Sequence, residues 1–133
     1  MPVTELPLFE TSSGTGRATA AVLSNRFLDI SAAVDPALNT ALDGGIPGVA
    51  HAGAGVKPAG VSMGAQPTIG KPVAFEGTPG RVVFVESGAA VAVGAAIESD
   101  ATGRAITRGT GLLAGKAWSA AGAAGTLIAV QLF

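Results

Sequence analysis

Glycine interrupts the apolar segments of this chain at short intervals, and this spacing limits the secondary structure that the chain can form. From Val61 to the end, short apolar runs alternate with Gly-containing turn signals. A stable helix needs a longer uninterrupted stretch, whereas strands joined by tight turns produce this pattern. We therefore predict an all-β fold, either a small β-barrel or a sandwich. The predicted strand segments read VSM, PVAFEG, RVVFVESG, AVAVG, AAIES, RAIT, LLAGKAWS and TLIAVQLF.

One hairpin and one internal similarity refine this prediction. In AAIESDATGRAIT, Asp100 and Gly103 are turn formers between two apolar segments, which indicates a hairpin. Segment 59–63 can be laid over segment 114–118, and the same displacement lays 70–75 over 125–130. A duplicated β unit that closes on itself would remove exposed sheet edges. The alternative is chance agreement between segments rich in Ala and Gly.

The part of the chain before Val61 is less regular. Residues 1–18 hold two prolines and the cluster TSSGTG, which is typical of an extended N-terminal arm. Two short strands are expected around the turn signal Ser24-Asn25. Asp35-Pro36, followed by Gly44-Gly45, predicts one short helix at about 36–43. The Gly-rich stretch from 44 to 60 is predicted to be a loop, so we divide the chain into an arm at 1–18 and a β-rich domain at 19–133 with a helix and loop insertion at about 35–58.

The composition excludes several classes of function. Cysteine is absent, which excludes disulfide scaffolds, thiol catalysis and cysteine-ligated metals. Charged residues make up 13% of the chain, and the eight basic residues are dispersed, so no nucleic-acid partner is expected. No apolar stretch is long enough to span a bilayer, so no membrane partner is expected either. Weak net charge with many small apolar residues favours permanent contacts with other subunits.

Patterns that could carry chemistry fail on inspection. The segment 109–114 fits a dinucleotide motif, but no acidic residue follows Asp100, so we interpret it as a turn between strands. His51 is the only histidine, and neither Ser62 nor Ser119 has a nucleophile-elbow pattern beside it, so an exposed loop histidine is expected. Glu98 and Asp100 could form an acid pair, but a solvated hairpin tip is the commoner arrangement. We predict no catalytic residue, no metal and no cofactor.

A small set of apolar residues is predicted to contact partners. Leu6, Leu8 and Phe9 in the arm either dock on a neighbouring subunit or cover the chain's own core. Trp118, the single tryptophan, either fills the core or anchors a contact. The core is favoured because the surrounding residues are small. Phe133 has the same two alternatives, with closure of the last strand favoured.

With the runs GAAVAVGAAIESDATGRAIT and GLLAGKAWSAAGAAGTLIAVQLF, the C-terminal half resembles the small capsid decoration, or cement, proteins of tailed bacteriophages. The likeness extends back to segment 26–28, where the family has a similar strand. In GAAVAVGAAIESDATGRAIT the matching residues are Gly94, Ala96, Ile97, Asp100, Gly103 and Arg104. In GLLAGKAWSAAGAAGTLIAVQLF they are Gly115, Ala117, Gly125, Ile128, Val130 and Leu132.

The resemblance implies a non-enzymatic structural role. Such a protein is made in the host cytoplasm and becomes part of the virion, where it binds the exterior of the phage head. There it stabilises contacts between subunits of the major capsid protein, commonly as a homotrimer or another homo-oligomer. A ligand-binding or receptor-binding β module of a phage fibre or spike is the alternative. Such modules expose aromatic platforms, whereas this chain has no Tyr and one Trp.

Overall fold

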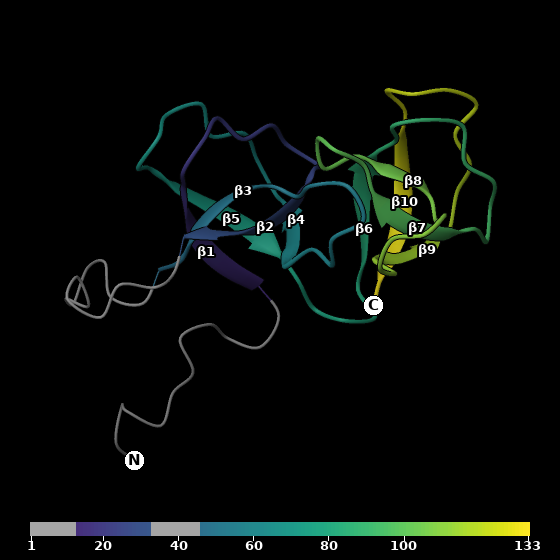
Figure 1. The fold of residues 1–133 in the computed structure, drawn as a ribbon, viewed down its shortest axis with the longest axis horizontal. Coiled ribbons are helices and arrows are strands. Elements are labelled where there is room, and N and C mark those ends of the chain that lie inside the picture. The colour runs from purple at the N-terminus through teal and green to yellow at the C-terminus, as the bar shows by residue number, and fades with distance from the viewer. Residues whose placement is uncertain (1–12, 33–45) are drawn as a thin grey trace, which may run out of the picture.

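The computed structural model describes residues 13–32 and 46–133, and all regular structure in these ranges is β. The strands form two units that lie side by side (Figure 1). This confirms the all-β prediction. The helix predicted at about 36–43 lies outside the described residues. The strands are β1 Ser13–Ala18, β2 Phe27–Ala32, β3 Gly48–His51, β4 Gly60–Ser62, β5 Pro72–Glu76, β6 Val82–Glu86, β7 Ala96–Ser99, β8 Ala105–Thr107, β9 Gly115–Ala117 and β10 Leu127–Leu132.

The first unit, residues 13–76, is a closed barrel with the strand order β1-β3-β2-β4-β5. Its neighbouring strands are antiparallel except for β1 and β3, which run parallel and close the barrel where Arg17 lies opposite Gly48. Because side chains alternate along each strand, one set points inward and forms a small separate core. This core consists of Ala18, Val22, Leu28, Val49, Val73 and Phe75.

The second unit, residues 82–132, is a five-stranded sheet with the order β6-β10-β9-β7-β8. Antiparallel β7 and β8 form the predicted hairpin. The edge strands β6 and β8 almost meet, because a single parallel bridge joins Ser87 to Ala105. The second unit is therefore a barrel that remains open along one seam.

The two units are copies of one pattern. In the first unit Phe27 pairs with Val61, and the equivalent pair in the second unit is Ala96 with Lys116. The displacement that lays 59–63 over 114–118 also places β4 and β5 over β9 and β10 without a change of register. The isolated bridge between Val22 and Gln66 likewise recurs between Val91 and Ala121. The structure thus confirms the internal similarity and extends it to the whole of both units.

The first unit is longer than the second between its second and third strands. Leu28 pairs with His51 in the first unit, whereas the equivalent Ile97 pairs with Thr107, which is much closer in sequence. The additional length of the first unit equals that of segment 33–45. The predicted insertion at 35–58 is therefore too long at its C-terminal end, because β3 lies within it and is a regular barrel strand.

The first unit fills the open seam of the second. In the first barrel, the Arg17 N–H donates to the Pro47 carbonyl at 2.8 Å. The equivalent groups of the second unit, the Glu86 N–H and the Gly103 carbonyl, bind instead to Asn25 and Phe27 at 2.9 and 2.7 Å. Segment 25–27 therefore lies between the two edges of the second sheet.

Arg26 and Gly103 complete this closure. The Arg26 guanidinium donates to the Glu86 carboxylate at 2.9 Å and to the Thr102 carbonyl at 3.0 Å. Gly103 has a φ of +80°, and a Cβ atom there would lie 2.5 Å from the Phe27 carbonyl oxygen. Only glycine fits this position, because both the backbone conformation and the close approach exclude a side chain.

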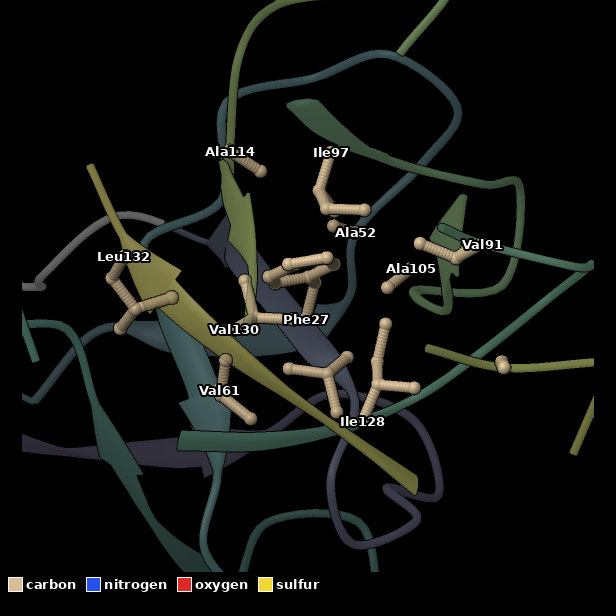
Figure 2. Packing of buried hydrophobic residues seen from close by; sticks show 13 residues of the cluster. Phe27, Ala52, Val61, Val91, Ile97, Ala105, Ala114, Ile128, Val130 and Leu132 are labelled. Atoms are coloured by element: carbon tan, nitrogen blue, oxygen red, sulfur yellow. The ribbon is translucent and has the colours of Figure 1, made fainter. Parts of the chain in front are cut away.

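Phe27 belongs to the core of the second unit although β2 is a strand of the first. Figure 2 shows its ring among residues of the second sheet such as Ile97 and Val130. Phe27 and Ile97 are 0% exposed. Leu28, the next residue, points the other way into the first barrel. The two units consequently share buried surface and form one folded body.

The structure corrects three sequence-based predictions about where strands lie. Residues 13–18, placed in the arm, form β1, which pairs with β5 over most of its length. Two inward positions of β1 are glycines because neighbouring side chains fill the space: a Cβ at Gly14 would lie 2.7 Å from the Phe75 ring. The loop predicted at 44–60 contains β3. The segments at 22–23 and 90–94, predicted as strands, form only isolated bridges.

Replacing Phe27 with alanine should destabilise the whole protein. Loss of a fully buried aromatic ring costs about 3 to 5 kcal/mol, and here the ring closes the core of the second unit. Urea unfolding of Phe27→Ala should show this loss. The matched control is Ile30→Ala on the same strand, which is 47% exposed and should cost much less. Equal losses in the two variants would contradict the role given to Phe27.

Truncation at two points should separate the arm from β1. Removal of residues 1–12 should leave the cooperative unfolding transition in place, because every barrel strand remains. Removal of residues 1–18 should abolish it, since β5 and β3 lose their shared neighbour and Phe75 loses its cover. Circular dichroism with thermal melting measures both variants. A folded protein without residues 13–18 would contradict the barrel assignment.

Candidate functional site

The outer surface of β6, β10 and β9 carries large apolar side chains. Along β6, Val83 and Val85 point toward the core, while Val82 and Phe84 point outward because side chains alternate. Phe84 is 59% exposed and Val82 is 37% exposed. Leu127 on β10 is 53% exposed. These side chains are directed away from the shared core.

Trp118 completes this surface. The backbone N–H of Trp118 donates to the Ala129 carbonyl at 2.7 Å, and Ala129 lies opposite Phe84 on the next strand. Phe84, Ala129 and Trp118 thus form one row across three neighbouring strands. The indole Nε1 donates to the Gln131 Oε1 at 3.2 Å, and the ring is 58% exposed. We call Val82, Phe84, Trp118 and Leu127 the apolar face.

The first unit shows that the fold does not require phenylalanine or leucine at two of these positions. When the two units are matched by their strand pairings, Thr15 is equivalent to Phe84 and Pro72 is equivalent to Leu127. Met63 is equivalent to Trp118, and its N–H makes the same contact, to the Ala74 carbonyl. The same backbone pairing therefore forms with threonine and proline in place of the phenylalanine and leucine.

A second comparison shows how outward positions respond to cover. Phe27 and Val61 point outward from the first barrel and are large and apolar where the second unit covers them. Their equivalents in the second unit, Ala96 and Lys116, are exposed, and they are small or charged. At these two positions, large apolar residues accompany cover by a neighbour. The apolar face carries such residues without any cover from the described part of the chain.

The predicted contact residues are placed as follows. Leu6, Leu8 and Phe9 lie outside the described residues. Trp118 is not a core residue, so the favoured interpretation was wrong and the contact interpretation stands as a prediction. The reason is that Ala117, not Trp118, occupies the inward position of β9. Phe133 is 44% exposed, and its N–H donates to the Ala114 carbonyl at 3.2 Å, which extends the pairing of the last strand as expected.

Phe84, Val82 and Leu127 were not singled out from the sequence. Their strands read VVFV and LIAV, which are apolar at every position, so the pattern does not show which side chains point outward. Comparison with the first unit would have supplied the missing signal, since Thr15 and Pro72 stand at equivalent positions.

The candidate chemical groups are occupied by structural hydrogen bonds. The Ser62 hydroxyl donates to the Leu23 carbonyl at 2.6 Å, while the Ser119 hydroxyl accepts from the Ala129 N–H at 2.8 Å. The Asp100 carboxylate accepts from the Thr102 and Arg104 N–H groups of its own turn, as predicted for a hairpin tip. Segment 109–114 lies between β8 and β9 without regular structure, as the turn interpretation predicts.

Within residues 13–32 and 46–133, no three acidic or histidine side chains gather into a potential metal site. The same ranges contain no helix long and apolar enough to cross a bilayer.

His51 is part of the framework and not an exposed loop residue as expected. It ends β3, and its Nε2 accepts the Leu23 N–H at 2.9 Å. Burial lowers the pKa of His51, and the positive charge of Arg26 lowers it further. Burial alone would raise the pKa of Asp100, but hydrogen bonds from Arg104 and Thr102 and the Arg104 charge lower it.

Comparisons with known proteins identify one shared fold. No family model matches the chain, and no curated protein matches it. Among solved structures, the N base of head fiber gp8.5 from bacteriophage phi29 is similar, with a TM-score of 0.72 and 22% sequence identity. The likeness covers 91% of this chain and 92% of that chain. At this identity it establishes a common fold that includes both units.

Acidification should destabilise the protein through His51. Its pKa in the folded state lies below the ordinary value, so stability is fully present above about pH 6.5 and is lost as the pH falls from there through the folded pKa. Thermal melts between about pH 7.5 and about pH 5 should show this loss. Asp100 does not contribute in this window, because its lowered pKa keeps it ionised.

The control for this prediction is His51→Gln, whose amide oxygen can still accept the Leu23 N–H but does not titrate. The variant should show a smaller fall in melting temperature across the same pH range. An identical fall in both proteins would assign the effect to other groups.

Proposed function

We propose that this protein is a structural component of a tailed-phage head, bound to the exterior of the shell as a decoration protein. It would hold neighbouring subunits of the major capsid protein together, as a homotrimer or another homo-oligomer. Two independent findings support this proposal. The C-terminal sequence resembles decoration proteins, and the fold is shared with the base of a phage head fiber. In this proposal the protein has no catalytic role and needs no cofactor.

The apolar face is the observation that carries the proposal. Phe84 and Trp118 are each more than half exposed on a sheet whose fold is already complete. An aromatic side chain offers roughly 150–250 Å² for burial, and burial contributes roughly 25 cal/mol per Å². Covering the exposed part of each ring would thus contribute about 2 to 4 kcal/mol. Repeated over a shell, contacts of this size make a large total.

A second candidate function is the base module of a head fibre. The similar phi29 protein is described as a head fiber base, and 92% of that chain is covered. A base module also contacts neighbouring proteins through its surface, so the apolar face fits both functions. The two differ in what they carry: a fibre base supports a projecting shaft, whereas a decoration protein reinforces the shell itself.

Binding to phage heads tests the proposal. Purified protein should bind heads that lack it and should raise their resistance to heating. The double variant Phe84→Thr, Trp118→Met takes the residues that the first unit uses at the same positions, so the fold should persist. We expect at least a tenfold loss of affinity, because exposed aromatic anchors contribute about 2 kcal/mol or more each at interfaces.

Met63→Ala is the matched control, since Met63 is the exposed counterpart of Trp118 on the first unit. Its affinity should stay close to that of the wild type. Electron microscopy of the decorated heads separates the two functions: density at many equivalent positions supports decoration, and density below projecting shafts supports a fibre base. Protein that binds no heads at all would refute both.

A further inference from the structure

The apolar face carries an unmatched positive charge. Lys116 points outward on β9, directly opposite Gln131 and beside the indole of Trp118. Within the described ranges it forms no salt bridge. The acidic residues of the second unit are engaged elsewhere: Glu86 binds Arg26, Glu98 accepts the Gly111 N–H, and Asp100 binds Arg104. The face therefore offers an apolar surface next to one free cation.

The segment Glu5-Leu6-Pro7-Leu8-Phe9-Glu10 has the complementary composition. Three large apolar residues lie between two acidic residues, and the chain holds no basic residue before Arg17. Apolar side chains that cover Phe84 and Trp118 would bring a carboxylate toward Lys116. Among short segments of this chain, 5–10 is the one that combines a run of large apolar residues with flanking acids.

We propose that residues 5–10 of one copy dock on the apolar face of a neighbouring copy. This inference rests on the proposed function, in which the protein acts in many adjacent copies. Two different surfaces of the same chain would then be complementary, which is the condition for a ring of identical subunits. The stretch from Ser13 back to Glu5 can span at most about 28 Å, so the segment can extend away from its own β1 strand.

Such a contact between two copies would also explain why the apolar face carries little charge. A tethered segment acts at a high effective concentration once one contact of a ring has formed. A short apolar segment is then sufficient, and one favourable charge pair sets its register. The same contact would account for Phe84 and Trp118 being large where Thr15 and Met63 suffice in the first unit.

Trp118 reports directly on this contact because it is the single tryptophan. In the full-length protein, light scattering with size-exclusion chromatography should show an oligomer. On dilution, the oligomer should dissociate and the Trp118 emission should shift to longer wavelength. The double variant Leu8→Ser, Phe9→Ser should be monomeric with red-shifted emission at all concentrations. Circular dichroism verifies that the variant is folded.

A charge reversal provides a second measurement. Lys116→Glu should weaken assembly at least tenfold, and the added substitutions Glu5→Lys and Glu10→Lys should restore it. Met63→Ser is the control and should leave assembly unchanged. An oligomer that is insensitive to both arm variants would overturn the proposal, and so would a monomer whose emission responds to them, since the segment would then cover its own face.

Binding of the variants to phage heads distinguishes failure of the docking proposal from failure of the proposed function. If the wild type binds heads and the arm variants bind equally well while they remain oligomeric, the docking of residues 5–10 is refuted and the proposed function stands. If only the substitutions at Phe84 and Trp118 reduce binding, the face contacts the shell itself, which also refutes the inference.

Discussion

Closure of the second unit by segment 25–27 is the contact on which the rest of the structure depends. Without it, the Glu86 N–H and the Gly103 carbonyl would lack their partners, and buried unpaired groups of this kind are costly. Phe27 adds the ring that the small side chains of the second core do not supply. The position of β6, and hence of the apolar face, follows from this closure, because Asn25 holds both Glu86 and Phe84.

Duplication within one chain gives each outward position an internal comparison. At some equivalent positions, one unit faces a neighbour and the other faces solvent. A difference in residue type at such a position can therefore be attributed to contact with the neighbour, because the backbone fold is the same in both units. Phe27 and Val61 compared with Ala96 and Lys116 illustrate this difference for a contact that is seen. Phe84 against Thr15 applies it to a contact that is not seen, which is the basis for proposing an assembly surface there.

The sequence predicts the strands of the second unit well, because each apolar run is bounded by turn residues. The hairpin at Asp100 and Gly103 is confirmed for this reason. Prediction fails at β1, where glycines face inward and Phe75 supplies the bulk, so that a barrel strand has the composition of a loop. It also fails at Trp118, since the small residues around this ring indicate a core that needs filling, whereas the ring that fills it is Phe27, distant in sequence. Packing between distant segments is not visible in local patterns.

The packing of the units is head to tail, and such contacts can in principle continue without end. Two features stop the series after two members. The seam of the first barrel is already closed by the bond from Arg17 to Pro47. The second unit's counterpart of segment 25–27 is Gly94-Ala95-Ala96, which has neither a guanidinium group nor a ring to insert. Within residues 13–32 and 46–133, neither seam therefore offers a site for end-to-end addition of further copies, and any larger assembly must form through other surfaces.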